Sequence, residues 1–79
     1  MRIQLEYFGP LRDERGLSSE TVWTTAETPR ELLRQLHESR SLSMNPVHLR
    51  LAVNGELSDW DRALAEDDRI VFLPPVSGG

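Results

Sequence analysis

One helix signal lies between segments of alternating polarity, and this order limits the folds open to the chain. Thr28 is a suitable N-cap, Pro29 fits a first helical turn, and Glu31 completes a capping box. Three leucines then recur on one side of the expected helix: Leu32, Leu33 and Leu36. The pattern predicts an amphipathic helix that runs to about residue 39 and buries one face.

The segments before this helix predict two strands. Residues 2–8 alternate, with Ile3, Leu5 and Tyr7 on one face. Gly9-Pro10 ends that run, and a helical turn is expected before Gly16. Residues 19–25 are rich in threonine, valine and tryptophan, which favours a strand paired with the first one as a hairpin.

The segments after the helix predict further strands. Residues 48–53 alternate again, and Asn54-Gly55 is typical of a tight hairpin turn. A shorter irregular stretch follows, and Asp67-Asp68 indicates another turn. Residues 70–73 are apolar on both faces, which is typical of a strand at the centre of a sheet.

The order strand, strand, helix, strand, short strand, strand predicts an α+β domain. A β-grasp (ubiquitin-like) roll fits this order, with a mixed sheet, one main helix, and the first and last strands side by side at the centre. We expect residues 1–73 to form the domain and residues 74–79 to form a flexible tail that points outward.

Composition excludes several classes of function. The chain has 79 residues, enough for one small core. Its net charge of −4 disfavours nucleic-acid binding and suits a basic protein partner. No apolar run approaches the roughly 20 residues that a membrane-spanning helix needs. Cysteine is absent, which fits a cytoplasmic protein. All nine basic residues are arginine, so no side chain can form a Schiff base or accept an isopeptide bond.

No pattern in the sequence predicts a catalytic centre, a metal site or a bound cofactor. His37 and His48 lie on different expected elements, without ligand spacing. The acidic segments at residues 59–61 and 66–68 lack the spacing of a calcium loop, and solvated turns explain both. Trp23 and Trp60 are most simply explained as packing residues.

The C-terminal tail carries the clearest functional signal. It ends in Gly78-Gly79, and without Cβ atoms these residues can thread a channel too narrow for any other residue. Pro74 and Pro75 stiffen its base. Six extended residues reach roughly 20 Å, so the terminal carboxylate of Gly79 can enter the active site of another protein.

A second signal is an expected apolar patch on the outer face of the sheet. Phe8 falls on the polar face of the first strand, and Val71 and Leu73 lie opposite the core face of the last strand. If these strands are neighbours, the three side chains form an exposed patch that Pro74, Pro75 and Leu57 extend. Such patches often mark protein contacts.

The ending Phe-Leu-Pro-Pro-Val-Ser-Gly-Gly, residues 72–79, closely resembles a family signature. It is similar to the C-terminus of the small subunits of molybdopterin synthase, the MoaD type of ubiquitin-like sulfur carriers in the MoaD/ThiS family. Tyr7-Phe8 with Leu11-Arg12, and Ala52-Val53-Asn54, also resemble that family. One departure is the segment 66–68, Glu-Asp-Asp, where the family usually has a glycine.

The resemblance implies a β-grasp sulfur carrier for molybdenum cofactor biosynthesis. A ubiquitin-activating-like partner would use ATP and Mg²⁺ to adenylate Gly79, and a sulfur donor would convert the adenylate to a thiocarboxylate. The tail would then enter the large synthase subunit, in a complex expected to be a heterotetramer, and donate sulfur to a cyclic pyranopterin precursor. The chain would be the non-catalytic, sulfur-donating co-substrate of this sulfurtransferase. The expected contact residues are Phe8, Leu57, Val71, Leu73, Pro74, Pro75, Val76 and Ser77, with Gly78 and Gly79 at the reacting end.

Three alternatives share much of this sequence evidence. The chain could carry sulfur for another pathway, such as thiazole, thiolated tRNA or cysteine synthesis, although Pro74-Pro75 argues against thiazole. It could be a ubiquitin-like modifier joined to lysines of other proteins. It could also be a plain β-grasp binding module, which would keep its activity after deletion of Gly78 and Gly79.

Overall fold

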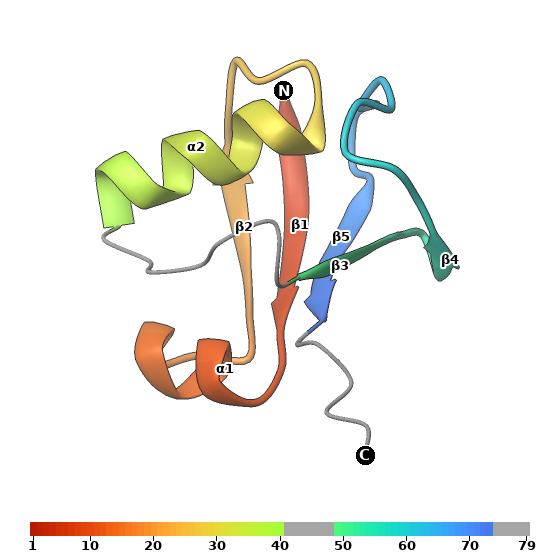
Figure 1. Cartoon of the computed structure of the whole chain (residues 1–79). Helices are drawn as coiled ribbons and strands as arrows, with labels where there is room; N and C mark the ends of the chain where they lie inside the picture. Colours follow the sequence, from red (N-terminus) through yellow and green to blue (C-terminus); the bar gives the residue numbers. More distant parts are fainter. Residues whose placement is uncertain (41–48, 74–79) are drawn as a thin grey trace.

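The computed structural model describes residues 1–40 and 49–73, which form one mixed sheet with a long helix across one of its faces (Figure 1). A short helix lies near one end of the sheet. The elements are β1 (Arg2–Tyr7), α1 (Pro10–Arg15), β2 (Ser19–Trp23), α2 (Pro29–Arg40), β3 (Arg50–Val53), β4 (Glu56–Leu57) and β5 (Arg69–Leu73). No helix in these ranges is long and apolar enough to cross a membrane.

The two central strands come from opposite ends of the sequence. The strand order is β2-β1-β5-β3-β4. β1 and β5 run parallel, and the other neighbouring strands run antiparallel. This mixed sheet with α2 packed on one face is a β-grasp fold, as the sequence pattern predicted. Because β5 lies at the centre, the chain leaves the sheet from a strand held on both sides.

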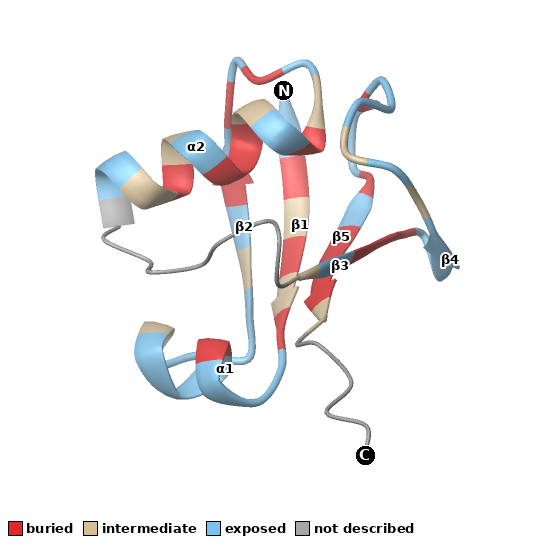
Figure 2. Cartoon of the chain, viewed as in Figure 1, coloured by how far each residue is buried: buried red, intermediate tan, exposed pale blue. Residues whose placement is uncertain are grey.

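The core lies between α2 and the facing side of the sheet (Figure 2). The predicted inward residues of β1 are almost fully buried, with Ile3, Leu5 and Tyr7 at most 1% exposed. The predicted helix stripe is confirmed as well. Its buried members are Leu32, Leu33 and Leu36. Burial of these aliphatic side chains, at about 1.5–3 kcal/mol each, supplies most of the drive for folding.

Helix α2 begins with a variant of the predicted capping box. The Glu31 backbone N–H donates to Thr28 Oγ1 over 3.3 Å, as expected. The Glu31 carboxylate, however, accepts from the backbone N–H of Glu27 at 2.8 Å and so reaches one residue further back than in a standard box. The helix ends at Arg40, one residue beyond the expected end.

Two turns each contain a residue other than glycine whose φ angle is positive. Asn54 and Gly55 have φ values of 53° and 87°, as the predicted hairpin turn requires. Asp67 has φ 64° in the turn before β5. That turn is where the sequence departs from the family pattern. Asp67 adopts the conformation that a glycine would take most easily.

Three details of the sequence interpretation are corrected by the structure. β3 begins at Arg50, and His48 lies outside the described residues. Trp23 is 72% exposed and is not a packing residue, because its side chain lies on the sheet face away from α2. Asp68 is 8% exposed and is not part of a solvated turn. Its carboxylate accepts hydrogen bonds from the Asn54 side chain and the Ala65 backbone, both at 2.9 Å.

Candidate functional site

The sheet face opposite α2 carries a row of side chains across four strands. The register places Glu6 of β1 beside Val71 of β5, Val71 beside Ala52 of β3, and Ala52 beside Leu57 of β4. Because side chains alternate along a strand, all four project from the same face. This row is therefore apolar between Glu6 and the β4 edge, while Arg50 and Arg69 lie on the same face in the neighbouring rows.

The predicted apolar patch exists in part. We define the docking patch as Phe8, Leu57 and Leu73. Phe8 is 46% exposed, Leu57 is 65% exposed, and Leu73 is half-buried. Leu73 follows Phe72, which is paired with Tyr7, so extending the register by one residue brings Phe8 beside Leu73.

Val71 does not belong to the exposed surface that was expected. It is 9% exposed and counts as buried. It lies on a central strand, where Glu6 and Ala52 flank it on the same face. Sequence alternation assigned its face correctly but gave no measure of how far neighbouring side chains shield it. Val71 therefore contributes little to the exposed surface of this face.

A hydrogen-bonded cluster fixes the residue that precedes Phe8. The Tyr7 hydroxyl donates to Glu20 Oε2 at 2.6 Å. Arg15 donates to both oxygens of the same carboxylate, at 2.8 and 3.0 Å. Burial and the bond to Glu20 raise the pKa of Tyr7 far above its ordinary value. With Tyr7 held inside, the next side chain must point outward, and this orients Phe8.

The sequence interpretation missed this cluster. Its members come from β1, α1 and β2, and no local motif joins them. The available signal was the pair of opposite charges, Arg15 and Glu20, on either side of the helix-ending Gly16. Gly16 has φ 80°, and its N–H donates to the Arg12 carbonyl at 2.9 Å, which returns the chain toward β2.

The end of β5 is packed on the core side of the sheet through Phe72. Trp60 stacks on Phe72 with ring centroids 6.0 Å apart and planes 8° from parallel. Phe72 is fully buried. The stacking contact holds the loop that carries Trp60 against β5. β5 thus presents its final residue, Leu73, from a well-packed strand. The predicted site residues Pro74, Pro75, Val76, Ser77, Gly78 and Gly79 lie outside the described residues.

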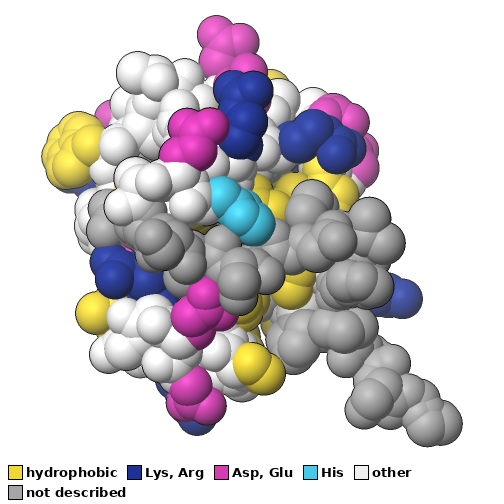
Figure 3. All heavy atoms as spheres, turned by 60° about the vertical axis from the view of Figure 1, so that its left-hand side comes forward, with side chains coloured by type: hydrophobic (Ala, Val, Ile, Leu, Met, Phe, Trp, Pro, Cys, Tyr) yellow, Lys and Arg dark blue, Asp and Glu magenta, His cyan; other side chains and the backbone are white. Residues whose placement is uncertain are grey.

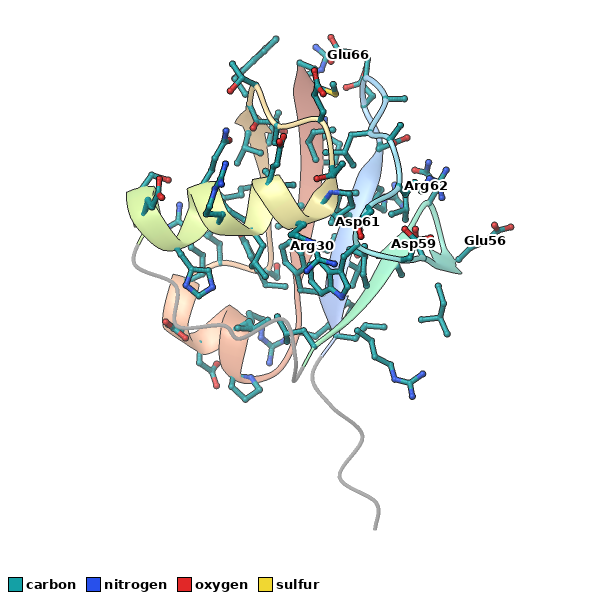
Figure 4. The ribbon with its side chains drawn as sticks, turned by 45° about the horizontal axis from the view of Figure 1, so that its top comes forward. Arg30, Glu56, Asp59, Asp61, Arg62 and Glu66 are labelled. Atoms are coloured by element: carbon teal, nitrogen blue, oxygen red, sulfur yellow. The ribbon has the colours of Figure 1, made fainter. Side chains whose placement is uncertain are left out.

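Charged and hydrophobic side chains are mixed on the surface of the domain. Acidic, basic and hydrophobic groups are interspersed on the side shown in Figure 3. In Figure 4, Arg30 of α2 lies next to Asp61, and Glu56, Asp59 and Arg62 lie along the segment that starts at β4. Arg30 donates to both oxygens of Asp61, at 2.9 and 3.2 Å, and lowers the pKa of that carboxyl. The exposed Arg50 of β3 lies beside Leu73 in the sheet register, so the docking patch has a basic neighbour on the same face.

The described residues contribute an exposed surface to the candidate site. In residues 1–40 and 49–73, no three histidine, aspartate or glutamate side chains come together as a metal site. His37 is half-buried on α2, as expected for a residue at the core boundary. The arrangement offers an exposed apolar patch near the end of β5, the strand from which the sequence continues to its terminal carboxylate seven residues after Phe72.

Comparison with known proteins identifies close sequence relatives. The ThiS family model matches residues 5–79. The molybdopterin synthase sulfur carrier subunit of Haemophilus influenzae is 33% identical over 80 residues, covering 98% of this chain and 99% of that protein. The protein of the same name from Escherichia coli is 29% identical with the same coverage.

Solved structures include two similar chains above 25% identity. SAMP1 from Haloferax volcanii has a TM-score of 0.77 at 26% identity, with full coverage of both chains. A complex of subunits 1 and 2 of the molybdopterin-converting factor from Helicobacter pylori contains a chain with a TM-score of 0.71 at 29% identity, again with full coverage of both. These matches extend over the whole length of the chain.

Proposed function

Because the chain belongs to the ThiS family, we propose that it is the sulfur carrier subunit of a molybdopterin synthase. One observation carries the proposal. The central strand β5, packed through Phe72, leads directly into a sequence that ends in Gly78-Gly79. The full-length similarity to two molybdopterin synthase sulfur carrier subunits supports this pathway over other sulfur-carrier pathways.

The proposed chemistry takes place at the main-chain carboxylate of Gly79. A free carboxylate is a poor electrophile. Its oxygen attacks the α-phosphorus of ATP on a partner adenylating enzyme, which uses Mg²⁺, and pyrophosphate leaves. The resulting acyl-adenylate has a good leaving group, and a sulfur donor displaces AMP to give the thiocarboxylate. Gly78 and Gly79 let the terminus pass through a narrow channel because they lack Cβ atoms.

The thiocarboxylate then serves the large synthase subunit as a co-substrate. The docking patch of Phe8, Leu57 and Leu73 binds that subunit, and the residues from Pro74 to Ser77 lead the terminus into its active site. There the sulfur attacks a cyclic pyranopterin precursor. The complex of subunits 1 and 2 from Helicobacter pylori supports a large-subunit partner. Catalytic side chains come from the partners, and this chain supplies the docking surface and the reacting group.

A second function is favoured by one specific similarity. SAMP1 of Haloferax volcanii is called a small archaeal modifier protein in another of its solved structures. A modifier would use the same Gly79 adenylate but form an isopeptide bond with a lysine of another protein. Because this chain has no lysine, it can serve only as the donor in such side-chain linkages.

The proposed activation can be tested with the cognate adenylating enzyme and Mg-ATP. We expect an adenylate at Gly79, detected by mass spectrometry as a covalent AMP adduct. Appending one residue after Gly79, or replacing Gly78 by tryptophan, should abolish the adduct and leave the melting temperature unchanged. The matched control is Arg34→Ala on the exposed side of α2, which should be adenylated normally.

Normal adenylation of the extended chain would refute a role for the free terminus. Adenylation followed by isopeptide formation, with no sulfur transfer, would favour the modifier function. The two outcomes differ in their products, which are a thiocarboxylate in one case and a lysine-linked conjugate in the other.

A further inference from the structure

Strand β2 forms an open edge of the sheet. It lies at the end of the strand order, and among the described strands it pairs only with β1. Figure 1 shows it on the outside of the sheet, and Figure 2 shows most of its length as exposed. An open edge offers unpaired backbone N–H and C=O groups to another strand.

The hydrogen bonds to β1 identify which groups point outward. The Tyr7 N–H donates to the Ser18 carbonyl at 2.8 Å, and the Thr24 N–H donates to the Met1 carbonyl at 2.9 Å. In an antiparallel pair, alternate residues bond to the same neighbour. Even-numbered residues from 18 to 24 therefore face β1. The backbone groups of Ser19, Thr21 and Trp23 face away from the sheet.

This edge lacks most of the features that usually prevent strands from joining. Such features are lysine, proline, a bulge, or a charge pointing inward. β2 has no lysine or proline, and its five residues pair with β1 without a bulge. Its single charge, Glu20, is opposite Leu5 and so lies on the core-facing side, but its carboxylate is bound by Arg15 and Tyr7 and leaves no unpaired charge at the edge. Trp23 is 72% exposed, with the Arg2 guanidinium 5.7 Å from its ring centre.

We propose that β2 is a self-association edge, which pairs antiparallel with β2 of a second copy around a twofold axis at Thr21. In this register Thr21 faces Thr21 of the second copy, and Ser19 faces Trp23. These are the residues whose backbone groups point outward, so every outward donor and acceptor on both strands has a partner. Glu20 faces Val22 on the other side of the ribbon.

The edge is self-complementary in charge and size. No like charges stand directly opposite one another, which would weaken strand pairing. The small Ser19 leaves room for the indole of Trp23. A five-residue edge buries little area, so the dimer belongs to the weak class of interfaces, with a dissociation constant of roughly 0.1–1 mM.

Self-association at β2 leaves the proposed docking patch accessible. Leu57 is on β4, at the opposite end of the strand order, and β5 is separated from β2 by β1. The two joined sheets would form one continuous ten-stranded sheet, twice the five strands of one copy. Each copy would keep its own docking patch and C-terminus. The inference therefore does not depend on the proposed function.

A charge-pairing experiment tests this register directly. Sedimentation velocity of the full chain from about 10 µM to about 2 mM should show a monomer–dimer equilibrium in that range. Thr21→Lys and Thr21→Glu each place like charges face to face at the twofold axis. Each should weaken self-association at least about tenfold. An equimolar mixture of the two variants should restore dimers, because opposite charges then meet. Ala63→Lys, in the exposed loop after β4, is the control and should dimerise like the unmodified chain.

Three other outcomes would contradict the proposal. A chain that stays monomeric at about 2 mM has no self-association edge, and β2 would then be open to a strand of a different protein. Dimers that survive both Thr21 variants but are lost with Phe8→Ala form through the docking patch. A mixture that remains monomeric, while the unmodified chain dimerises, excludes the register centred on Thr21. Circular dichroism of each variant confirms that the monomers are folded.

Discussion

At the scale of single residues, Tyr7 connects stability with the site. Its ring is buried in the core, its hydroxyl is bonded to Glu20, and it directly precedes Phe8. Loss of this anchor would free the end of β1 and the start of α1. The orientation of Phe8 therefore depends on a buried polar bond that connects three elements.

The raised pKa of Tyr7 predicts a specific loss of stability at high pH. An unfolded tyrosine ionises near pH 10. The folded chain keeps the Tyr7 proton to higher pH, so this contribution to stability is complete below about pH 10 and decreases as the pH rises further. No lysine or cysteine is present, so Tyr7 is the one side chain whose ordinary pKa lies between about 9 and 11.

Denaturant unfolding from pH 9 to 11 measures this effect. The free energy of unfolding should decrease across that range, and the decrease should be absent in Tyr7→Phe. The absorbance of the tyrosinate reports the same residue, because the chain has a single tyrosine. A titration midpoint near pH 10 in the folded protein would show that Tyr7 is neither shielded nor held by Glu20.

At the scale of elements, helix α2 and the two turns differ in how far sequence could predict them. The helix was predictable because capping residues and a leucine stripe are local signals with a fixed period. The hairpin at Asn54-Gly55 was predictable for the same reason. The role of Asp68 was not, since its partner Asn54 is 14 residues away. A buried aspartate and a solvated one look the same in a sequence.

Leu36→Ala should destabilise the domain by about 2–5 kcal/mol. Leu36 is 3% exposed on the face of α2 that packs against the sheet, and truncation removes buried contacts and leaves a cavity. Thermal or denaturant unfolding measures the loss. Arg34→Ala on the exposed side of the same helix should change stability by less than about 0.5 kcal/mol. Equal effects of the two substitutions would mean that the helix face is assigned wrongly.

At the scale of the whole molecule, the fold brings Phe8 and Leu73 together at one end of its two central strands, β1 and β5. The sequence predicted the hairpin of β1 and β2 and the central pair of β1 and β5, because hydrophobic patterns and chain order limit the possible topologies. It predicted an exposed Phe8 and Leu57 as well. It overestimated the exposure of Val71 and missed the exposure of Trp23, because both depend on neighbouring strands.

Phe8→Ala should weaken binding of the large synthase subunit by about 1–3 kcal/mol, the range of an aromatic interface anchor. The isolated domain should lose much less stability, because Phe8 is already 46% exposed. Trp23→Ala is the matched control. It removes a larger exposed aromatic side chain from edge strand β2, beside Arg2 at the end of β1 far from Phe8, and should leave affinity unchanged.

Titration calorimetry and thermal melts together separate the possible results. If Phe8→Ala unfolds the domain, Phe8 is a core residue. If Trp23→Ala weakens binding as much as Phe8→Ala does, the large subunit binds a different face. Unchanged affinity in both variants would leave the tail as the sole contact.

The central claim is that Gly79 carries sulfur, and the mass of the C-terminal peptide tests it most directly. Chain purified from its native cells and cleaved with trypsin after Arg69 yields residues 70–79. This peptide contains no methionine or tryptophan, so their oxidation cannot imitate the change. We predict a form about 16 Da heavier, with sulfur in place of one carboxylate oxygen. The added mass should disappear after incubation with the large subunit and the pyranopterin precursor. A peptide with only the unmodified mass, from cells that are actively making the cofactor, would contradict the account.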